Sequence, residues 1–199
     1  MNSDDQAPQQ QATSLHFDPF QDRLCRDIRN QLSESIIACL RTDRLDPAQQ
    51  VARRFLTMQL APHQQAYIEQ RLAGYGRFLE QVATGPEDVL WQGLVLWDLA
   101  LYFEVHELLE QAWHRARGEE KLLLQAMIRA AGVYIKGEYG YTEAAAKLAA
   151  KALPVLKSQR QRLAVYIDPE RLYAAMRNPT TPAPLLLGGA ILRPTRSHG

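Results

Sequence analysis

Residues 101–113 decide the fold, and they read Leu-Tyr-Phe-Glu-Val-His-Glu-Leu-Leu-Glu-Gln-Ala-Trp. In an α-helix over about 101–116, which turns 100° per residue, the aliphatic side chains gather on one broad face. The polar side chains that fall opposite this face are expected to be solvated: Glu104, Glu107, Gln111 and His114. His106 and Glu110 belong to neither group, because side chains at i and i+4 lie one above the other, here flanked by Phe103 and Trp113.

The His106–Glu110 pair is the candidate site of this helix. A carboxylate beside two large aromatic rings needs a partner, because an unpaired buried ion costs on the order of several kcal/mol. Three partners are possible: the histidine, a donor on a neighbouring helix, or a divalent metal. A histidine and a carboxylate at i,i+4 can together bind a metal such as zinc, manganese or iron. The zincin motif is excluded, since its second histidine is replaced by Glu110. We favour a buried, hydrogen-bonded structural cluster over a metal site, and a metal site over a metal-free catalytic or binding role.

A second apolar helix, over about 122–134, is expected to supply partners for this pair. It is apolar nearly all round, which is typical of a central helix, and Gln125 and Arg129 interrupt it at i,i+4. In an antiparallel hairpin, Arg129 would reach either Glu110, as a charge-assisted hydrogen-bond donor, or Glu107 at the surface. The predicted polar cluster is His106, Glu107, Glu110, Trp113, Gln125 and Arg129. The metal ligands within it would be His106 and Glu110, with Glu107 as a third ligand or a general base.

The rest of the chain predicts an all-α fold, a single-domain helical bundle built around antiparallel helical hairpins. Apolar residues recur at helical spacing over about 19–41, 47–59, 64–82 and 143–156, and Asp-Pro pairs at 18–19, 46–47 and 168–169 are typical helix starts. Gly74 and Gly76 interrupt one of these helices, which favours close packing of a neighbouring helix. The glycine-rich stretch 136–141 is interpreted as a turn.

Three regions are predicted along the chain. Residues 1–14 are polar and lack periodicity, which indicates a disordered tail, and residues 15–177 form a single all-helical domain. Residues 178–199 form a proline-rich tail. Its apolar residues, 185–187 and 191–192, are expected to pack back on the domain as an extended strap or to bind a partner.

The pattern His106-x-x-x-Glu110-x-x-Trp113, with 102–105 before it and Leu123-Leu124-Gln125 after it, resembles domain-of-unknown-function family 309. The family-like core is 86–177. The resemblance implies a small all-helical bacterial or archaeal protein without an established activity. The histidine, glutamate and aromatic residue that members share have been suggested to bind metal. The resemblance also implies a tight turn at 98–101 between two helices, as in a tetratricopeptide hairpin. Many members have histidine where this chain has Ile135, and glycine where it has Ala126, so a third nitrogen ligand is lacking.

Composition narrows the functional classes. The 23 Lys and Arg residues nearly balance the 22 Asp and Glu residues, so no global charge attracts nucleic acid or anionic lipid. Cys25 and Cys39 lie too far apart on one expected helix to pair. No signal-peptide pattern or membrane span is recognisable, and we therefore expect a cytoplasmic protein. A local basic run at Lys147, Lys151, Lys157, Arg160 and Arg162 is interpreted as a solvated face.

Three functions remain open, and the sequence does not decide whether the protein is an enzyme. We favour an interaction or scaffold module that forms a homo-oligomer or binds a protein partner. The alternative is a divalent-metal-binding protein or metal-assisted hydrolase that uses His106 and Glu110. Nucleic-acid binding through the basic run from Lys147 to Arg162 is the weaker alternative, because aromatic residues do not interleave with the basic ones.

Overall fold

The structure, a computed structural model, describes residues 16–179 and 182–188. Over these ranges the chain forms helices and no strand, which confirms the predicted all-α class. The predicted disordered tail, 1–14, lies outside the described residues. The helices are α1 Arg23–Thr42, α2 Asp46–Leu56, α3 Pro62–Val82, α4 Val89–Asp98, α5 Tyr102–Arg115, α6 Gly118–Glu138, α7 Thr142–Ser158, α8 Arg160–Leu163 and α9 Pro169–Arg177.

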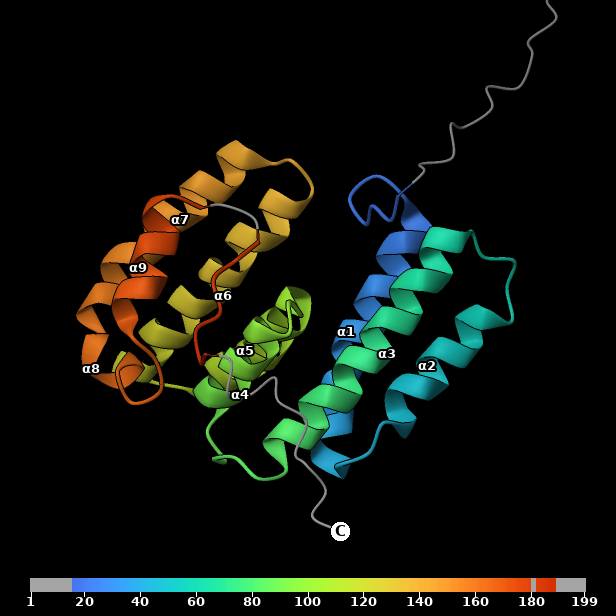
Figure 1. Ribbon diagram of the computed structural model, residues 1–199, viewed down its shortest axis with the longest axis horizontal. Coiled ribbons are helices and arrows are strands. Elements are labelled where there is room, and N and C mark those ends of the chain that lie inside the picture. Colours follow the sequence, from blue (N-terminus) through green and yellow to red (C-terminus); the bar gives the residue numbers. More distant parts are fainter. Residues whose placement is uncertain (1–15, 180–181, 189–199) are drawn as a thin grey trace, which may run out of the picture.

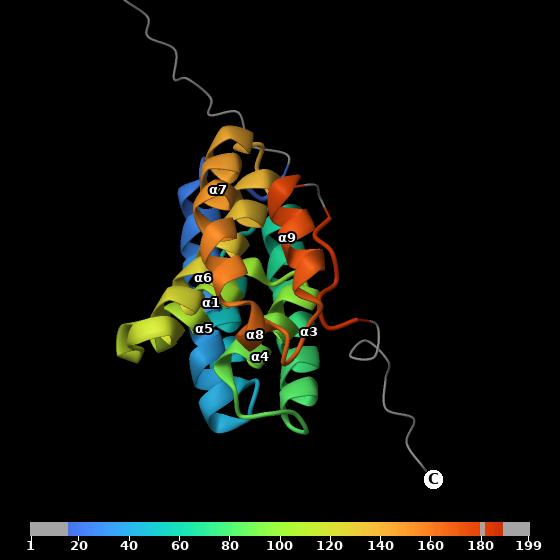
Figure 2. The same ribbon diagram turned by 90° about the vertical axis from the view of Figure 1, so that its left-hand side faces the viewer.

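The helices form three groups, with the α4–α5 hairpin in the middle. Helices α1, α2 and α3 lie on one side of the hairpin, and α6, α7, α8 and α9 lie on the other (Figure 1). The junction of α5 and α6 projects from the side of the bundle (Figure 2). The beginning of α5 is therefore enclosed by neighbouring helices, whereas its end approaches solvent.

Two clusters of buried apolar side chains hold these groups together. The main cluster runs through α3 to α7 and α9, and α1 contributes Ile36 and Cys39 to it. A smaller N-terminal cluster lies among α1, α2 and α3, and Ile28 and Leu32 of α1 belong to it. Helix α1 thus contributes to both clusters. Each fully buried aliphatic side chain contributes roughly 1.5–3 kcal/mol to stability.

The α4–α5 hairpin has the tight turn that the family resemblance implied at 98–101. Ala100 has a positive φ of 56°, so the chain reverses within a few residues after Asp98. The two helices pack closely, because a Cβ atom on Gly93 would lie 2.9 Å from a Leu109 methyl group. The Asp88 carboxylate caps α4 by accepting hydrogen bonds from the Leu90 and Trp91 amides.

Several element boundaries differ from the predictions: α2 ends at Leu56 rather than at about 59, and α6 begins at Gly118 rather than at about 122. Helix α1 begins four residues later than expected, because Asp22 caps it by accepting a 2.8 Å hydrogen bond from the Cys25 amide, whereas Asp18 caps a separate preceding turn. Helix α6 continues through Glu138, so the predicted turn at 136–141 is confined to 139–141. Packing of α6 between α5 and α7 outweighs the low helix propensity of its glycines.

The tail segment, defined here as 182–188, packs on α4. The Trp97 indole donates a 3.0 Å hydrogen bond to the Pro184 carbonyl, and the Leu186 and Leu187 amides donate to the Asp98 carboxylate at 2.7 and 2.9 Å. The expected strap is confirmed for these residues, while 191–192 lie outside the described ranges. The predicted domain boundary at 177 stays a prediction. Among the described residues, no helix has the length and apolar character that a membrane crossing requires.

Candidate functional site

Helix α5 carries two sets of polar side chains that face different parts of the molecule. Glu104 was expected to be solvated, and this expectation is wrong, because the side chain is fully buried. Helical periodicity predicts one buried face for this helix. In the structure α5 packs against α1, α4 and α6, and side chains of α3 contact it as well. Little of its first half therefore remains open to solvent.

Glu104 forms a buried triad with two residues of α3, Arg71 and Tyr75. The Tyr75 hydroxyl donates a 2.6 Å hydrogen bond to Oε1 of Glu104, and the Arg71 guanidinium lies 3.4 Å from Oε2. Burial and the adjacent carboxylate raise the pKa of Tyr75 well above its usual value. Burial alone would lower the pKa of Arg71, but the combined charges of its neighbours outweigh burial and raise the pKa; Glu104 contributes most, followed by Tyr67, Tyr75 and Glu138. The triad therefore joins α3 to α5 by a charged contact in the interior.

The sequence contained a signal for this triad. Arg71 lies in phase with the apolar residues Tyr67, Ile68 and Tyr75 of its helix, and Glu104 lies in phase with Leu101 and Leu108 of α5. A charged residue on a buried stripe requires an opposite charge on a facing helix. The pairing partner lies 33 positions away, and the choice of facing helices was not available from local periodicity.

The polar cluster predicted on α5 forms around His106, but it is not buried. Nδ1 of His106 lies 3.9 Å from Oε1 of Glu107 and 3.8 Å from Oε2 of Glu110. The side chains of His106, Glu107 and Glu110 are 37%, 25% and 45% exposed, respectively. The prediction of a buried, aromatic-enclosed cluster is therefore wrong. The physical reason is that α5 emerges from the bundle toward its projecting end (Figure 2).

Partial burial and neighbouring carboxylates together set the electrostatics around these three residues. Burial, together with the nearby Glu34 and Glu110, raises the pKa of Glu107 to about 7, and Arg29 of α1 partly offsets the rise. Burial lowers the pKa of His106, which outweighs the opposing charge of Glu110, so its imidazole is neutral at pH 7. A neutral imidazole keeps a free lone pair, and the crowded carboxylates favour a cation.

The other predicted members of the cluster lie nearby without joining it. Arg129 lines a cavity of about 290 Å³ together with His106 and Glu107. Among the described residues, no hydrogen bond or ion pair links Gln125 or Arg129 to the three residues, so the expected contact of Arg129 with Glu110 or Glu107 is not formed. Trp113 is half-buried, and the Lys121 ammonium lies 4.5 Å from its ring centre.

The basic run is partly neutralised by contacts within the molecule. Arg160 forms an ion pair with Glu170 at 2.6 Å, and Arg162 pairs with Asp88 and, at 3.6 Å, with Glu120. The remaining members, Lys147, Lys151 and Lys157, are exposed on α7. The run therefore does not present five free cations to a nucleic acid, and nucleic-acid binding stays a prediction with reduced support.

Comparison with known proteins finds a family match for the central part of the chain. Residues 90–148 match the model of the family described as Domain of unknown function (DUF309), which confirms the family resemblance over this segment. The matched residues include the whole predicted polar cluster, whereas Arg71 and Tyr75 of the buried triad precede them. No curated protein and no solved structure matches the chain.

Proposed function

We propose that this protein binds a divalent cation through His106, Glu107 and Glu110 of α5. The observation that carries the proposal is that one ligand atom from each of these side chains lies within 4.8 Å of the other two. One imidazole nitrogen and two carboxylate oxygens suit zinc, manganese or iron(II). The half-exposed position supports access of an ion from solvent.

The charges of the site support a cation more than a structural role. The pKa of Glu107 is raised first by burial and then by the neighbouring Glu34 and Glu110, and a divalent ion would replace the repulsion between these carboxylates by attraction. A structural cluster would instead need hydrogen bonds from Gln125 or Arg129, and the described residues form none with it. The neutral imidazole of His106 is also the protonation state that a metal ligand requires.

The proposed site has three protein ligands, so water would complete the coordination shell. Ile135, where many relatives have histidine, is buried beside the same cavity and offers no ligand atom. We therefore expect weaker binding than at a structural site with four protein ligands. An ion held in this way would supply a Lewis acid with open coordination positions.

The metal-assisted hydrolase stays a second candidate. The Glu107 carboxylate has a pKa of about 7, which suits a general base. Hydrolysis of p-nitrophenyl phosphate by the manganese-loaded protein tests this candidate. Turnover that is lost in Glu107→Gln and retained in His114→Ala would support it, and the absence of turnover would eliminate it.

The interaction or scaffold role has less support from the surface. The exposed large apolar side chains of the described residues are scattered over several elements rather than gathered in one patch: Leu56, Met58, Leu122, Val165 and Leu185. A patch of a few hundred Å² is the usual mark of a protein-binding surface. Homo-oligomer formation and a protein partner, like the cytoplasmic location, therefore stay predictions.

Metal binding is tested by titration with zinc and manganese in a calorimeter, after removal of bound ions with a chelator. We expect one ion per chain, with at least tenfold weaker binding in His106→Ala and Glu110→Gln. His114→Ala is the matched control, because it removes an exposed histidine from the same helix outside the cluster. Equal affinities of His106→Ala and His114→Ala would contradict the proposal, as would the absence of binding.

A thermal readout separates metal binding from a purely structural role. An ion at about 100 times its dissociation constant adds about 2.7 kcal/mol to the free energy of unfolding, so the Tm should rise with added metal. We expect this rise in the unmodified protein and not in His106→Ala. A structural cluster predicts the reverse, namely a lower Tm of His106→Ala without metal and no response to metal in either protein.

A further inference from the structure

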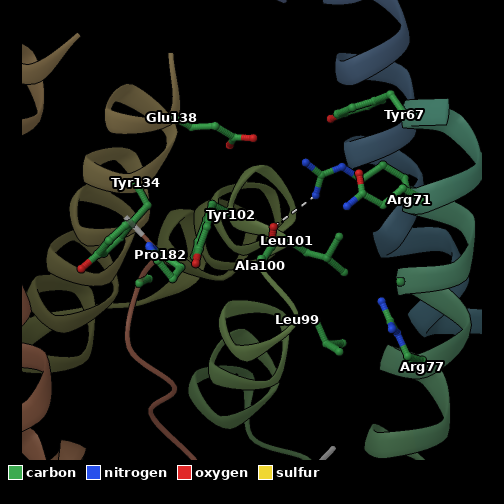
Figure 3. A pocket seen from close by; sticks show the side chains of 13 residues that line it. Tyr67, Arg71, Arg77, Leu99, Ala100, Leu101, Tyr102, Tyr134, Glu138 and Pro182 are labelled. Atoms are coloured by element: carbon green, nitrogen blue, oxygen red, sulfur yellow. Dashed lines mark hydrogen bonds between the residues drawn. The ribbon is translucent and has the colours of Figure 1, made fainter. Parts of the chain in front are cut away.

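A second cavity, of about 410 Å³, lies between α3, the α4–α5 turn, the end of α6 and the tail segment (Figure 3). It is separate from the cavity at His106, and the inference drawn from it does not depend on metal binding. Arg71 of the buried triad forms part of its wall, and Tyr67, Tyr102 and Tyr134 contribute aromatic rings. Cavities of this size hold small organic molecules.

Three buried hydrogen-bonding atoms in the walls of this cavity have no partner among the described residues. They are Nε of Arg71 and the hydroxyl oxygens of Tyr67 and Tyr134. A buried group of this kind is costly when it is left unsatisfied, and native proteins retain few of them. Arg71 and Tyr67 lie on the same wall and can each donate a hydrogen bond, so a molecule bound against this wall would need an acceptor.

The side chain of Arg71 is held in place by contacts with the Ala100 carbonyl and with Glu104. Its Nη1 lies 3.4 Å from both the Ala100 carbonyl and Oε2 of Glu104, while Nε has no acceptor. The side chain is 8% exposed, and Tyr75 fixes the Glu104 carboxylate from the other side. Figure 3 shows the guanidinium of Arg71 and the ring of Tyr67 on the same wall of the cavity. A guanidinium fixed in this way is preorganised to bind a carboxylate.

We propose that this cavity binds a small organic monocarboxylate, with the carboxylate on Arg71 and Tyr67 and an apolar, planar body toward Tyr102 and Tyr134. The rings of Tyr102 and Tyr134 stack with centroids 5.4 Å apart and form one wall for the body. Further apolar lining comes from Leu99, Leu101, Pro182 and Ala183. Tyr134 contributes its ring to this wall, because its hydroxyl lies at the end of the ring that is turned away from Arg71 (Figure 3).

The charges at the rim determine which anions fit. Arg77 lies at the rim on α3 and adds a second positive charge on the side of Arg71. Glu138 faces them from the end of α6, across the cavity (Figure 3). A second negative group on the ligand would lie toward Tyr102 and Tyr134, where the lining offers no positively charged partner, and would lose its hydration without compensation. The cavity therefore favours a monocarboxylate over a dicarboxylate of the same size.

The proposal is tested by NMR titration of the full-length, nitrogen-15-labelled protein with benzoate, benzamide and terephthalate. We expect saturable shifts from benzoate at the amides of Gly74, Ala100 and Tyr102, with at least tenfold weaker binding of the neutral benzamide. Terephthalate should bind more weakly than benzoate. Equal affinities of benzoate and benzamide would overturn the proposal, as would the absence of saturable shifts up to about 10 mM, a range that includes weak fragment binding.

Two variants test the residues without relying on a destabilised fold. Tyr67→Phe removes a hydroxyl that has no hydrogen-bond partner among the described residues, so the variant should fold normally and bind benzoate roughly 3- to 10-fold more weakly. The double variant Arg71→Met/Glu104→Gln removes both charges together, and the side-chain amide that it introduces keeps an oxygen as the acceptor for Tyr75. This variant should lose at least tenfold in affinity.

Arg29→Met is the matched control for the double variant. Its Nε is also buried without a partner among the described residues, but it lines the cavity at His106 instead. We expect unchanged benzoate affinity in this control. Two outcomes would overturn the assignment of the site. One is that Arg29→Met loses as much benzoate affinity as the double variant. The other is that the benzoate affinity is unchanged in both Tyr67→Phe and the double variant. Titration in the presence of a chelator keeps this result independent of metal binding.

Discussion

Glu104 and Glu107 lie three residues apart on α5, and their surroundings give them different roles. Glu104 is fully buried and meets the guanidinium of Arg71 and the hydroxyl of Tyr75, which compensate the loss of hydration. Glu107 is 25% exposed and has other carboxylates nearby. A buried carboxylate with two partners stabilises the contact between helices, whereas a crowded carboxylate near the surface is available to a cation.

The raised pKa of Glu107 predicts a pH dependence of stability. Between its ordinary value of 4.5 and its value of about 7 in the folded protein, the folded state keeps a proton that the unfolded chain has released. The free energy of unfolding therefore falls as the pH rises through this window. Glu107→Gln removes this loss and should be about 1–3 kcal/mol more stable than the unmodified protein at pH 8, and about equally stable at pH 4.5.

Urea unfolding at pH 4.5 and pH 8 in the presence of a chelator measures this difference. Glu80→Gln, which changes an exposed glutamate of α3, is the control and should follow the unmodified protein at both pH values. If Glu107→Gln and the unmodified protein differed in free energy of unfolding by the same amount at both pH values, the carboxylate environment described for Glu107 would be incorrect.

At the scale of the element, the α4–α5 hairpin positions both cavities and the three proposed metal ligands. Its turn brings the Ala100 carbonyl to Arg71, and α5 then presents Glu104 to one side and His106 to another. The close approach of the two helices depends on the missing side chain of Gly93, which faces Leu109. A shift of α5 relative to α4 would alter every site that the helix carries.

Gly93→Val should therefore destabilise the protein by about 2 kcal/mol. The new Cβ atom would lie 2.9 Å from a methyl group of Leu109, which is fully buried and has little room to move. Gly76→Val is the matched control, since a Cβ atom there meets nothing within 4 Å, and it should change stability by less than about 0.5 kcal/mol. Urea unfolding measures both. Equal losses in the two variants would show that helix propensity, rather than the contact with Leu109, determines the result.

At the scale of the whole molecule, the two apolar clusters are coupled through shared helices. Helix α1 contributes to both, Leu72 of α3 packs against both, and the Arg71–Glu104 contact joins α3 to α5. The N-terminal cluster cannot lose its packing without exposing part of the main one. We therefore expect the described domain to unfold in one cooperative transition.

Two spectroscopic probes test this cooperativity. All three tryptophans, Trp91, Trp97 and Trp113, lie in α4 and α5, whereas far-UV circular dichroism reports every helix. The two unfolding curves should coincide. Ile28 lies in the N-terminal cluster, which contains no tryptophan. Ile28→Ala should lower the free energy of unfolding by about 2–5 kcal/mol and shift the fluorescence midpoint as much as the circular dichroism midpoint. A separate early loss of helix signal, with an unchanged tryptophan midpoint, would indicate two independent units.

The sequence by itself determined the all-α class, the main course of the helices and the family of the central segment. Helical periodicity, proline at helix starts and the cap at Asp168 act within a few residues, so they are readable without tertiary contacts. The sequence also identified His106, Glu107 and Glu110 as neighbours, because i,i+1 and i,i+4 positions of one helix stay close in any packing.

Only the tertiary structure decided which of these polar groups are buried. Burial depends on which helices pack around α5, and those helices are distant in the sequence. The pairing of Glu104 with Arg71, the exposure of His106 and Glu110, and the cavity beside Tyr67 all follow from that arrangement. A periodic pattern states which residues share a face of a helix, but the number of faces that neighbours cover is a property of the folded molecule.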